Sequence, residues 1–278
     1  FITHITSHPH DSDLIVESQS KEIKQFFCKP HKNNDITSAY LGNAGISIIN
    51  KRLLKLKPPT KAVSLFKYLS EQNKDNSFKI FSYNTSEYIK DIGTPERFRK
   101  TEKLILKNHI QKFSYSRKQK ALFLDRDGTL IDCPAKSYIT NIEQIKYKFN
   151  VINYIRTIIN SYTLCIVVTN QPQIAMGIVS FDDVSHINAK IINDLYKFGL
   201  KIDLVTICPH HPHSGFAGEE NTLKTSCFCR KPEPGLIIAE AFRRNIDLKK
   251  SLLIGDTIND KIASFKAGCN FLNVSEIS

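Results

Sequence analysis

The sequence predicts an α/β protein whose second half is a doubly wound parallel sheet. Three observations predict this fold. From Lys120 onward, short apolar runs alternate with segments of helical periodicity. The apolar runs are continuous rather than alternating with polar residues, which is typical of strands buried on both faces. Polar residues follow each run directly, and in parallel sheets the ligands bind at the carboxyl ends of the strands.

The elements of this second half follow one another in a regular order. The predicted strands are ALFL, LCIVV, DLVTI and SLLIG, at residues 121–124, 164–168, 203–207 and 251–255. The predicted helices between and after them cover residues 145–159, 181–198, 234–244 and 259–267. Such an alternation is expected of βαβ units.

The first half reads as a separate domain, and we predict domains at 1–112 and 120–278 with a linker at 113–119. The β-like runs FITHIT, GISII and FKIFSYN lie among turn signals, with a weaker helical stretch at 60–70. A clearer helix begins at Pro95, because Thr94 can cap it and proline suits the first helical position. The stretch QKFSYSRKQK that follows is polar and basic without an apolar period. Because the chain opens inside a strand-like run, we expect it to be a fragment.

Composition limits the classes of partner. The net charge is +12 over 278 residues, but the basic residues are scattered and form no stripe interleaved with aromatic residues. We therefore interpret the charge as compositional and expect no nucleic-acid partner. No apolar run approaches the about 18 residues of a membrane helix, and no signal-peptide pattern is present. We expect a cytoplasmic protein without a membrane partner; the sequence specifies no oligomeric state.

Two aspartates, Asp125 and Asp127, end the first strand of the second half. Carboxylates this close repel each other, so we expect a cation or covalent chemistry to use them. With Asp256, at the end of the last predicted strand, they form an oxygen-lined pocket suited to Mg²⁺. One carboxylate can attack phosphorus while the other transfers protons, and Thr169 and Lys231 can stabilise the charge on a transferred phosphoryl group. A capped turn is the alternative for an isolated D-x-D pair.

A second cluster lies in the loop CPHHPHSGFAGEENTLKTSCFCRKP. Its spacings C-x-H and C-x-C offer a tetrahedral ligand set for structural Zn²⁺, formed by Cys208, His210, Cys227 and Cys229. His211 is an alternative imidazole ligand, and four unrelated reduced side chains are the other alternative. Because Cys229 directly precedes Arg230 and Lys231, zinc would aim these two cations at the phosphate pocket.

The motifs LDRDGTL, VVTNQ, CRKPEPG and LIGDTINDK resemble, in this order, the four motifs of the haloacid dehalogenase-like phosphohydrolases, over about residues 120 to 275. The resemblance implies Asp125 as nucleophile and Asp127 as general acid and base. It implies that phosphate or substrate is bound by Thr169, Asn170, Gln171, Arg230 and Lys231. It also implies Mg²⁺ binding by Asp125, Asp127 and Asp256, with Asp260 as a supporting acid.

A cysteine loop before CRKPxPG is similar to that of the D-glycero-D-manno-heptose 1,7-bisphosphate 7-phosphatases and the histidinol-phosphate phosphatases. The resemblance implies a small anionic sugar phosphate as substrate, cleaved at C7 through an aspartyl-phosphate, in nucleotide-activated heptose and lipopolysaccharide biosynthesis. Histidinol phosphate is the alternative substrate, and only Glu219 and Glu220 are candidates to meet its amine. The TNQSGIARG of the heptose family reads TNQPQIAMG here.

The first half resembles the later part of sugar-1-phosphate nucleotidyltransferases in the segments HPHDSDLI, NAGISII and YIKDIGTPERF. The resemblance implies a metal ligand at Asp91 and sugar contacts at Asn43, Ala44 and Gly45, and ordinary turns are the alternative. The family's glycine-rich nucleotide-phosphate loop has no match, so we do not expect nucleotide transfer by this chain alone. A fragment of a bifunctional nucleotidyltransferase/phosphatase and a catalytically silent scaffold are the remaining alternatives.

Overall fold

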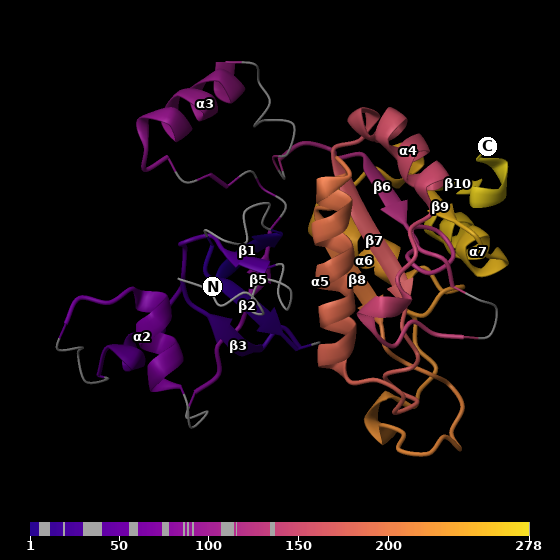
Figure 1. The fold of residues 1–278 in the computed structure, drawn as a ribbon, viewed down its shortest axis with the longest axis horizontal. Coiled ribbons are helices and arrows are strands. Elements are labelled where there is room, and N and C mark those ends of the chain that lie inside the picture. Colours follow the sequence, from indigo (N-terminus) through magenta and orange to yellow (C-terminus); the bar gives the residue numbers. More distant parts are fainter. Residues whose placement is uncertain are drawn as a thin grey trace. The chain divides into compact units, whose positions relative to one another are not determined.

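The structure is a computed structural model of the 278-residue chain. It describes residues 1–5, 12–18, 20–29, 41–55, 61–73, 78–85, 87, 89–90, 92–106, 114, 116–133 and 137–277. The chain divides into two compact units, Phe1–Thr85 and Ser86–Ser278 (Figure 1). The predicted linker at 113–119 lies within the second unit, and the predicted domain limits stay a prediction.

The first unit contains a five-stranded sheet in the order β3-β2-β4-β1-β5. Its strands are β1 (Ile2–Ile5), β2 (Leu14–Glu17), β3 (Ile23–Phe27), β4 (Leu41–Asn43) and β5 (Tyr83–Asn84). All pairs are antiparallel except β1 with β5. The helix α2 (Leu65–Gln72) begins after Ser64, whose side chain accepts a hydrogen bond from the Lys67 N–H at 3.2 Å.

The run GISII is not a strand, contrary to the prediction. It makes no ladder with a described strand, and Ile48 is 93 % exposed. A strand needs a continuous ladder and a face to pack on, whereas among the described residues the backbone contact of this run with a strand is a single hydrogen bond, from the Ile2 N–H to the Ile46 carbonyl at 2.9 Å. The Asn43–Gly45 segment forms a turn instead, in which the Gly45 N–H donates to Asn43 Oδ1 at 3.0 Å and Gly45 has a φ of 75°. Asp91 lies outside the described residues.

The second unit contains the predicted parallel sheet. Its order is β10-β9-β6-β7-β8, and every neighbouring pair is parallel. The strands are β6 (Ala121–Leu124), β7 (Leu164–Asn170), β8 (Leu204–Cys208), β9 (Leu252–Gly255) and β10 (Asn270–Asn273). The first four confirm the predicted strands within one or two residues, whereas β10 was not predicted.

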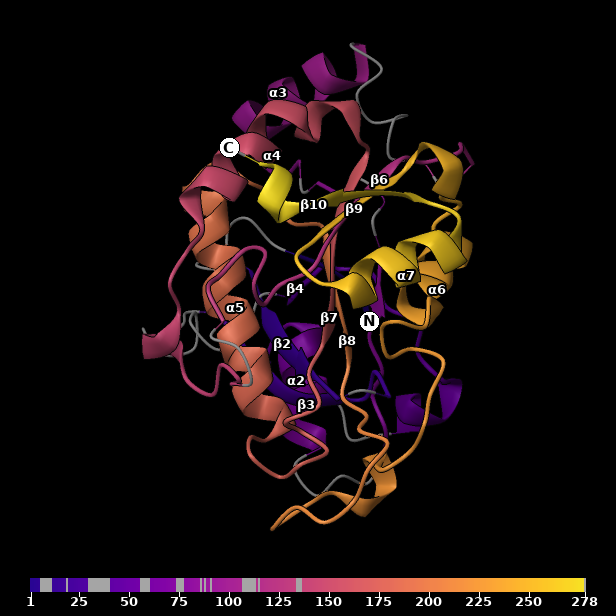
Figure 2. The ribbon, with the colours of Figure 1, turned by 90° about the vertical axis from the view of Figure 1, so that its right-hand side faces the viewer.

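Helices cover both faces of this sheet, as expected of a doubly wound fold. Figure 2 shows α4 (Phe149–Ile158) and α5 (Phe181–Lys197) on one face, and α6 (Gly235–Arg243) and α7 (Ile258–Ala267) on the other. Alternate strand residues such as Phe123 and Ile166 pack with Ile237 and Ala263 from the second pair of helices. The sheet is therefore buried on both sides, which explains its continuous apolar strands.

Two helices of this unit test the predicted boundaries. The helix α3 (Pro95–Leu106) begins at Pro95 as predicted, and Thr94 Oγ1 accepts a hydrogen bond from the Arg97 N–H at 3.2 Å. The helix predicted from residue 145 begins only at Phe149. The reason is that Tyr147 is bridged to Ile131 and the Lys148 N–H donates to the Leu130 carbonyl at 3.0 Å, so this segment is extended.

The parallel arrangement places four chain segments at one edge of the sheet. Asp125 follows β6, Asn170 ends β7, Cys208 ends β8 and Asp256 follows β9. The residues predicted to act together are thus brought to the same edge from distant parts of the sequence. In the part of the chain that the structure describes, no helix combines the length and apolarity needed to cross a membrane.

Candidate active site and cysteine cluster

The centre of the site is a buried ion pair between Asp125 and Lys231. Lys231 Nζ lies 2.5 Å from Asp125 Oδ1 and 2.5 Å from Asp260 Oδ1, and the Lys231 side chain is 4 % exposed. Burial raises the pKa of Asp125 to about 7; the Lys231 ammonium opposes this rise, and Asp260 and Asp127 add to it. Burial acts to lower the pKa of Lys231, but the two carboxylates outweigh it and raise that pKa. The lysine therefore stays a cation beside Asp125.

Asp256 completes a cluster of carboxylates next to this pair. One oxygen each from Asp125, Asp256 and Asp260 lies within 4.8 Å of the others. Asp256 Oδ1 is buried and has no hydrogen-bond partner among the described residues, and burial followed by the nearby Asp260 raises the pKa of Asp256. A buried carboxylate oxygen without a partner is costly, and a cation would satisfy it. These side chains fit Mg²⁺, which takes few carboxylates together with water and phosphate oxygens.

Asp260 has a structural task that explains its supporting position. Its Oδ2 accepts hydrogen bonds from the Thr257 N–H at 3.1 Å and from Thr257 Oγ1 at 2.5 Å, and the Asp260 N–H donates to Thr257 Oγ1 at 3.3 Å. This reciprocal cap begins α7. The other oxygen is held by Lys231, so the helix cap positions the lysine.

Asp127 lies apart from that carboxylate group. Its Oδ1 accepts from Arg126 Nε at 3.0 Å, and its Oδ2 accepts from Arg126 Nη2 at 2.9 Å and from Gln171 Nε2 at 2.7 Å. The Asp127 side chain is 21 % exposed, whereas Arg126 behind it is 1 % exposed. Asp127 thus presents a fixed carboxylate with both oxygens engaged, and its role as a third Mg²⁺ ligand stays a prediction.

The side chains of Asn170 and Gln171, which were predicted to bind substrate, form hydrogen bonds with other residues of the site. Asn170 Nδ2 donates to the Lys231 carbonyl at 2.9 Å, and the Lys231 N–H donates to Asn170 Oδ1 at 3.0 Å. Gln171 is fully buried, and besides Asp127 its Nε2 donates to Thr169 Oγ1 at 2.8 Å. These two residues therefore position Lys231, Asp127 and Thr169.

Two residues at the site were missed from the sequence. Arg126 lies between the two aspartates of the D-R-D motif, and a charged residue at the end of a buried strand was the available signal. Lys148 precedes α4 and its Nζ donates to the Gly128 carbonyl at 2.8 Å. A single lysine in a polar segment gave no signal. Gly128 itself has a φ of 83°, and a Cβ there would lie 2.1 Å from Asp256 Oδ2, so only glycine fits.

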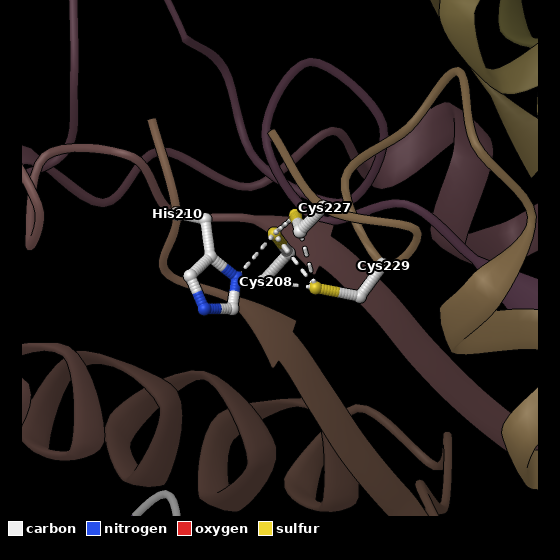
Figure 3. Close-up of side chains that lie close together, drawn as sticks. All are labelled: Cys208, His210, Cys227 and Cys229. Atoms are coloured by element: carbon white, nitrogen blue, oxygen red, sulfur yellow. Dashed lines mark hydrogen bonds between the residues drawn. The ribbon is translucent and has the colours of Figure 1, made fainter. Parts of the chain in front are cut away.

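The structure brings together the four predicted zinc ligands (Figure 3). The Cys208 and Cys227 sulfurs are 3.5 Å apart, and Cys229 Sγ lies 3.2 Å from Cys208 Sγ and 3.3 Å from Cys227 Sγ. His210 Nδ1 lies 3.2 Å from Cys229 Sγ. All of these cysteines are free. Three sulfurs and one imidazole nitrogen at mutual contact fit the tetrahedral set of a structural Zn²⁺ site.

His211 does not belong to this cluster. Its Nδ1 contacts the backbone of His213, with the His213 N–H at 3.2 Å, and its ring packs edge-on against Phe216. Of the two histidines left open by the sequence, the geometry favours His210. The hydrogen bond between Cys229 and Cys208 comes first among the causes that lower the pKa of Cys229 to about 5, and burial opposes it. Cys229 is thus poised to be a thiolate, the form that binds zinc.

The loop between the cysteines is held by its own polar contacts. Glu219 Oε2 accepts from the Gly215 and Phe216 N–H groups at 2.9 and 3.0 Å, and Lys224 Nζ lies 3.1 Å away and 4.3 Å above the Phe216 ring. Glu220 Oε1 accepts from Thr222 Oγ1 at 2.7 Å. Both acids considered for an amine substrate are therefore engaged within the loop.

This loop also contacts the segment after β7. The Glu220 N–H donates to the Ala175 carbonyl at 3.0 Å. A Cβ at Gly177 would lie 2.0 Å from the Gly218 carbonyl oxygen, so the two backbones touch. At the other end of the loop, Arg230 Nη1 donates to the His210 carbonyl at 3.3 Å. The cysteine cluster is thus connected both to the segment that begins with Gln171 and to the residue before Lys231.

The fold and the site define the class of protein. Asp125 and Asp127 follow the first strand of a parallel sheet, and Lys231 and Asp256 lie beside Asp125. This arrangement is that of a haloacid dehalogenase-like phosphatase. No family model matches the sequence. A crystal structure from Mesorhizobium loti that is named as a HAD-like phosphatase matches with a TM-score of 0.50 and 30 % identity, covering 55 % of this chain and 70 % of that one.

Curated relatives narrow the family. Over 151 residues the chain is 35 % identical to the D-glycero-alpha-D-manno-heptose-1,7-bisphosphate 7-phosphatase of Photorhabdus laumondii, covering 54 % of this chain and 79 % of the relative. It is 33 % identical over 145 residues to the D-glycero-beta-D-manno-heptose-1,7-bisphosphate 7-phosphatase of the same organism, covering 52 % of this chain and 73 % of the relative. The histidine biosynthesis bifunctional protein HisB of Buchnera aphidicola is 32 % identical over 170 residues, with 57 % and 44 % covered. The chain belongs to the family of the heptose-1,7-bisphosphate 7-phosphatases.

Proposed function

We propose that this protein is a Mg²⁺-dependent phosphatase that removes the C7 phosphate of D-glycero-D-manno-heptose 1,7-bisphosphate. One observation carries the proposal: the buried Asp125 carboxylate at the end of β6 is paired with Lys231, with Asp256 beside it. A buried aspartate with a fixed cation is suited to attack on a phosphate, whose charge the cation stabilises. The substrate is inferred from the curated relatives.

The reaction would proceed in two steps at Asp125. First, a carboxylate oxygen of Asp125 attacks phosphorus, the bond from phosphorus to the sugar oxygen breaks, and Asp127, which enters this step as the neutral carboxylic acid, gives that oxygen its proton and becomes a carboxylate. Second, Asp127 takes a proton from water as the water oxygen attacks the phosphorus of the aspartyl-phosphate, which releases phosphate and restores Asp125. Lys231 and Thr169 stabilise the charge on the transferred group in both steps.

The two metals have separate tasks in this proposal. Mg²⁺, held by Asp125 and Asp256, would neutralise the negative charge of the substrate phosphate and of the carboxylates. Asp127, also predicted as a ligand, has its carboxylate engaged by Arg126 and Gln171. Zn²⁺, held by Cys208, His210, Cys227 and Cys229, would fix the loop that precedes Arg230 and Lys231. Arg230 adds a second cation for an anionic sugar phosphate.

Histidinol phosphate is the weaker candidate substrate. An amine-bearing substrate needs a free acid, and in the described structure Glu219 is held by Lys224 while Glu220 is held by Thr222. The anomer is open, because the alpha- and beta-specific relatives are about equally similar to this chain. We further propose that the product serves nucleotide-activated heptose and lipopolysaccharide synthesis in the cytoplasm. The nucleotidyltransferase-like first half stays a prediction.

The test is phosphate release by the full chain, supplied with Mg²⁺ and Zn²⁺, from both anomers of heptose 1,7-bisphosphate and from histidinol phosphate. We expect phosphate to be released fastest from one heptose anomer. Asp125→Asn should abolish this release. Preference for histidinol phosphate would leave the mechanism intact and contradict the substrate. A folded protein that releases phosphate from none of the three would contradict the proposed activity and favour the scaffold alternative.

A further inference from the structure

Arg126 is a buried cation that the proposed mechanism does not use. It is 1 % exposed, although it carries a full positive charge. A charge this deeply buried is costly unless it is paired and its hydrogen-bond donors are satisfied. Among the described residues its charged partner is Asp127, and its other contacts are the neutral side chains Gln171 and Asn188.

The contact between Arg126 and Asp127 is a two-point fork. Nε donates to Oδ1 at 3.0 Å and Nη2 donates to Oδ2 at 2.9 Å, so both carboxylate oxygens are held by one planar group. A fork of this kind sets the plane of the carboxylate as well as its position. Lysine has a single ammonium and cannot reproduce it.

The guanidinium is itself fixed from behind. Its Nη1 donates to Asn188 Oδ1 at 2.8 Å, and Asn188 is a buried residue of α5. Its Nη2 also donates to Gln171 Oε1 at 2.7 Å, and the same Gln171 amide donates to Asp127 and to Thr169. The network thus ties Asp127, at the end of β6, to the helix α5 and to the phosphate-binding end of β7.

We propose that Arg126 is a positioning residue that orients Asp127 for proton transfer to and from the reacting oxygens. This inference rests on the proposed function, because it assigns Arg126 a task only if Asp127 is the general acid and base. It specifies which step depends on the fork. Protonation of the leaving oxygen matters for an alkyl phosphate, whose alkoxide leaves poorly, and hardly matters for p-nitrophenyl phosphate, whose phenolate leaves without a proton.

The test compares the wild type with Arg126→Lys in single-turnover release of the first product. The substrates are p-nitrophenyl phosphate and whichever alkyl phosphate of the earlier assay the wild type hydrolyses best. We expect the alkyl phosphate rate to fall about 100-fold, as for a misplaced catalytic group, and the p-nitrophenol rate to fall less than about fivefold. KM for the alkyl phosphate should change little, since the fork does not touch the substrate.

A second variant, Asn188→Ala, keeps the inference testable if Arg126→Lys does not fold. Asn188→Ala removes the support behind the guanidinium and leaves both contacts to Asp127, so we expect the same selectivity with about a tenfold loss for the alkyl phosphate. Thermal unfolding shows which variants are folded. Equal losses for the two substrates in a folded variant would overturn the inference and assign Arg126 a structural role only.

The wild-type enzyme distinguishes failure of the proposed function from failure of the inference about Arg126. A wild type that hydrolyses p-nitrophenyl phosphate in an Asp125-dependent way but none of the three alkyl phosphates contradicts the substrate and also the acid role of Asp127 on which the inference depends. A wild type that hydrolyses an alkyl phosphate while Arg126→Lys loses nothing contradicts the inference alone.

Discussion

The side-chain amide of Asn170 holds the backbone of Lys231 at two points. Its oxygen accepts from the Lys231 N–H at 3.0 Å and its nitrogen donates to the Lys231 carbonyl at 2.9 Å. The residues are 61 positions apart in the sequence. This contact fastens the end of the cysteine loop to the end of β7, so the position of Lys231 is set by a strand terminus as well as by the two carboxylates at its Nζ.

Replacing Asn170 should therefore displace Lys231. Two hydrogen bonds of about 1 kcal/mol each predict that Asn170→Ala lowers kcat/KM for the heptose bisphosphate by about 30-fold. Steady-state kinetics check this, with Asn160→Ala, an exposed asparagine in the same unit, as the matched control. An Asn170→Ala enzyme with wild-type kcat/KM would show that the clamp does not set the lysine.

Removal of zinc should damage catalysis together with folding of the loop. We expect Cys229→Ser and His210→Ala to lose bound zinc, to unfold at lower temperature and to lose most phosphatase activity, because structural zinc contributes folding free energy. Elemental analysis and thermal unfolding measure the first two effects. His211→Ala is the control and should keep zinc. Full activity of a zinc-free protein that still binds Mg²⁺ would refute the link between the cysteine cluster and Lys231.

Two neighbouring glycines test the contact between the cysteine loop and the segment after β7. Gly177 and Gly218 have similar φ values, 71° and 76°, so alanine is strained at both positions. Only at Gly177 would a Cβ meet a backbone atom, the Gly218 carbonyl oxygen at 2.0 Å; at Gly218 the nearest atom is 4.0 Å away. We expect Gly177→Ala to lower the free energy of unfolding by about 2 kcal/mol more than Gly218→Ala. Urea unfolding measures both, and equal losses would contradict a tight backbone contact.

Magnesium should stabilise the protein more at higher pH. The folded-state pKa of Asp125 is raised from 3.8 to about 7, so its contribution to stability is present below the unfolded pKa and is lost as pH rises through about 7. Mg²⁺ binds the ionised carboxylate and compensates that loss, whereas at low pH it must displace the proton. We expect the gain in Tm from Mg²⁺ to be larger at about pH 8 than at about pH 5.5. Asp125→Asn should reduce the difference, and an equal gain at both pH values would argue against Asp125 as a ligand.

Much of the second unit could be predicted because local pattern and tertiary structure agree there. Strands such as ALFL are buried on both faces and read as continuous apolar runs, so their ends and the aspartates that follow are visible in the sequence. The strand β10 was missed because its sequence, NFLN, is short and polar at both ends. Its pairing with β9 is a tertiary event that the local pattern does not contain.

The site divides in the same way. Asp125, Lys231 and Asp256 belong to motifs that predict their roles, and the cysteine spacing predicted the group of side chains that the structure brings together. The hydrogen-bond partners of each side chain could not be predicted from the sequence. Gln171 lies beside the predicted phosphate binder Thr169, yet its amide faces Arg126 and Asp127 inside the protein. The Arg126 side chain that Gln171 meets is itself held by Asn188 of α5, a helix that lies outside any motif.

The most direct test of the central claim is to trap the phosphorylated enzyme. The full chain is mixed with radiolabelled heptose 1,7-bisphosphate and Mg²⁺, quenched in acid within one turnover, and its peptides are analysed for bound phosphate. The proposed mechanism predicts an acid-stable, base-labile phosphate on the wild-type peptide that contains Asp125, absent in Asp125→Asn. A wild type that releases phosphate but yields no labelled Asp125 peptide would contradict the proposed mechanism.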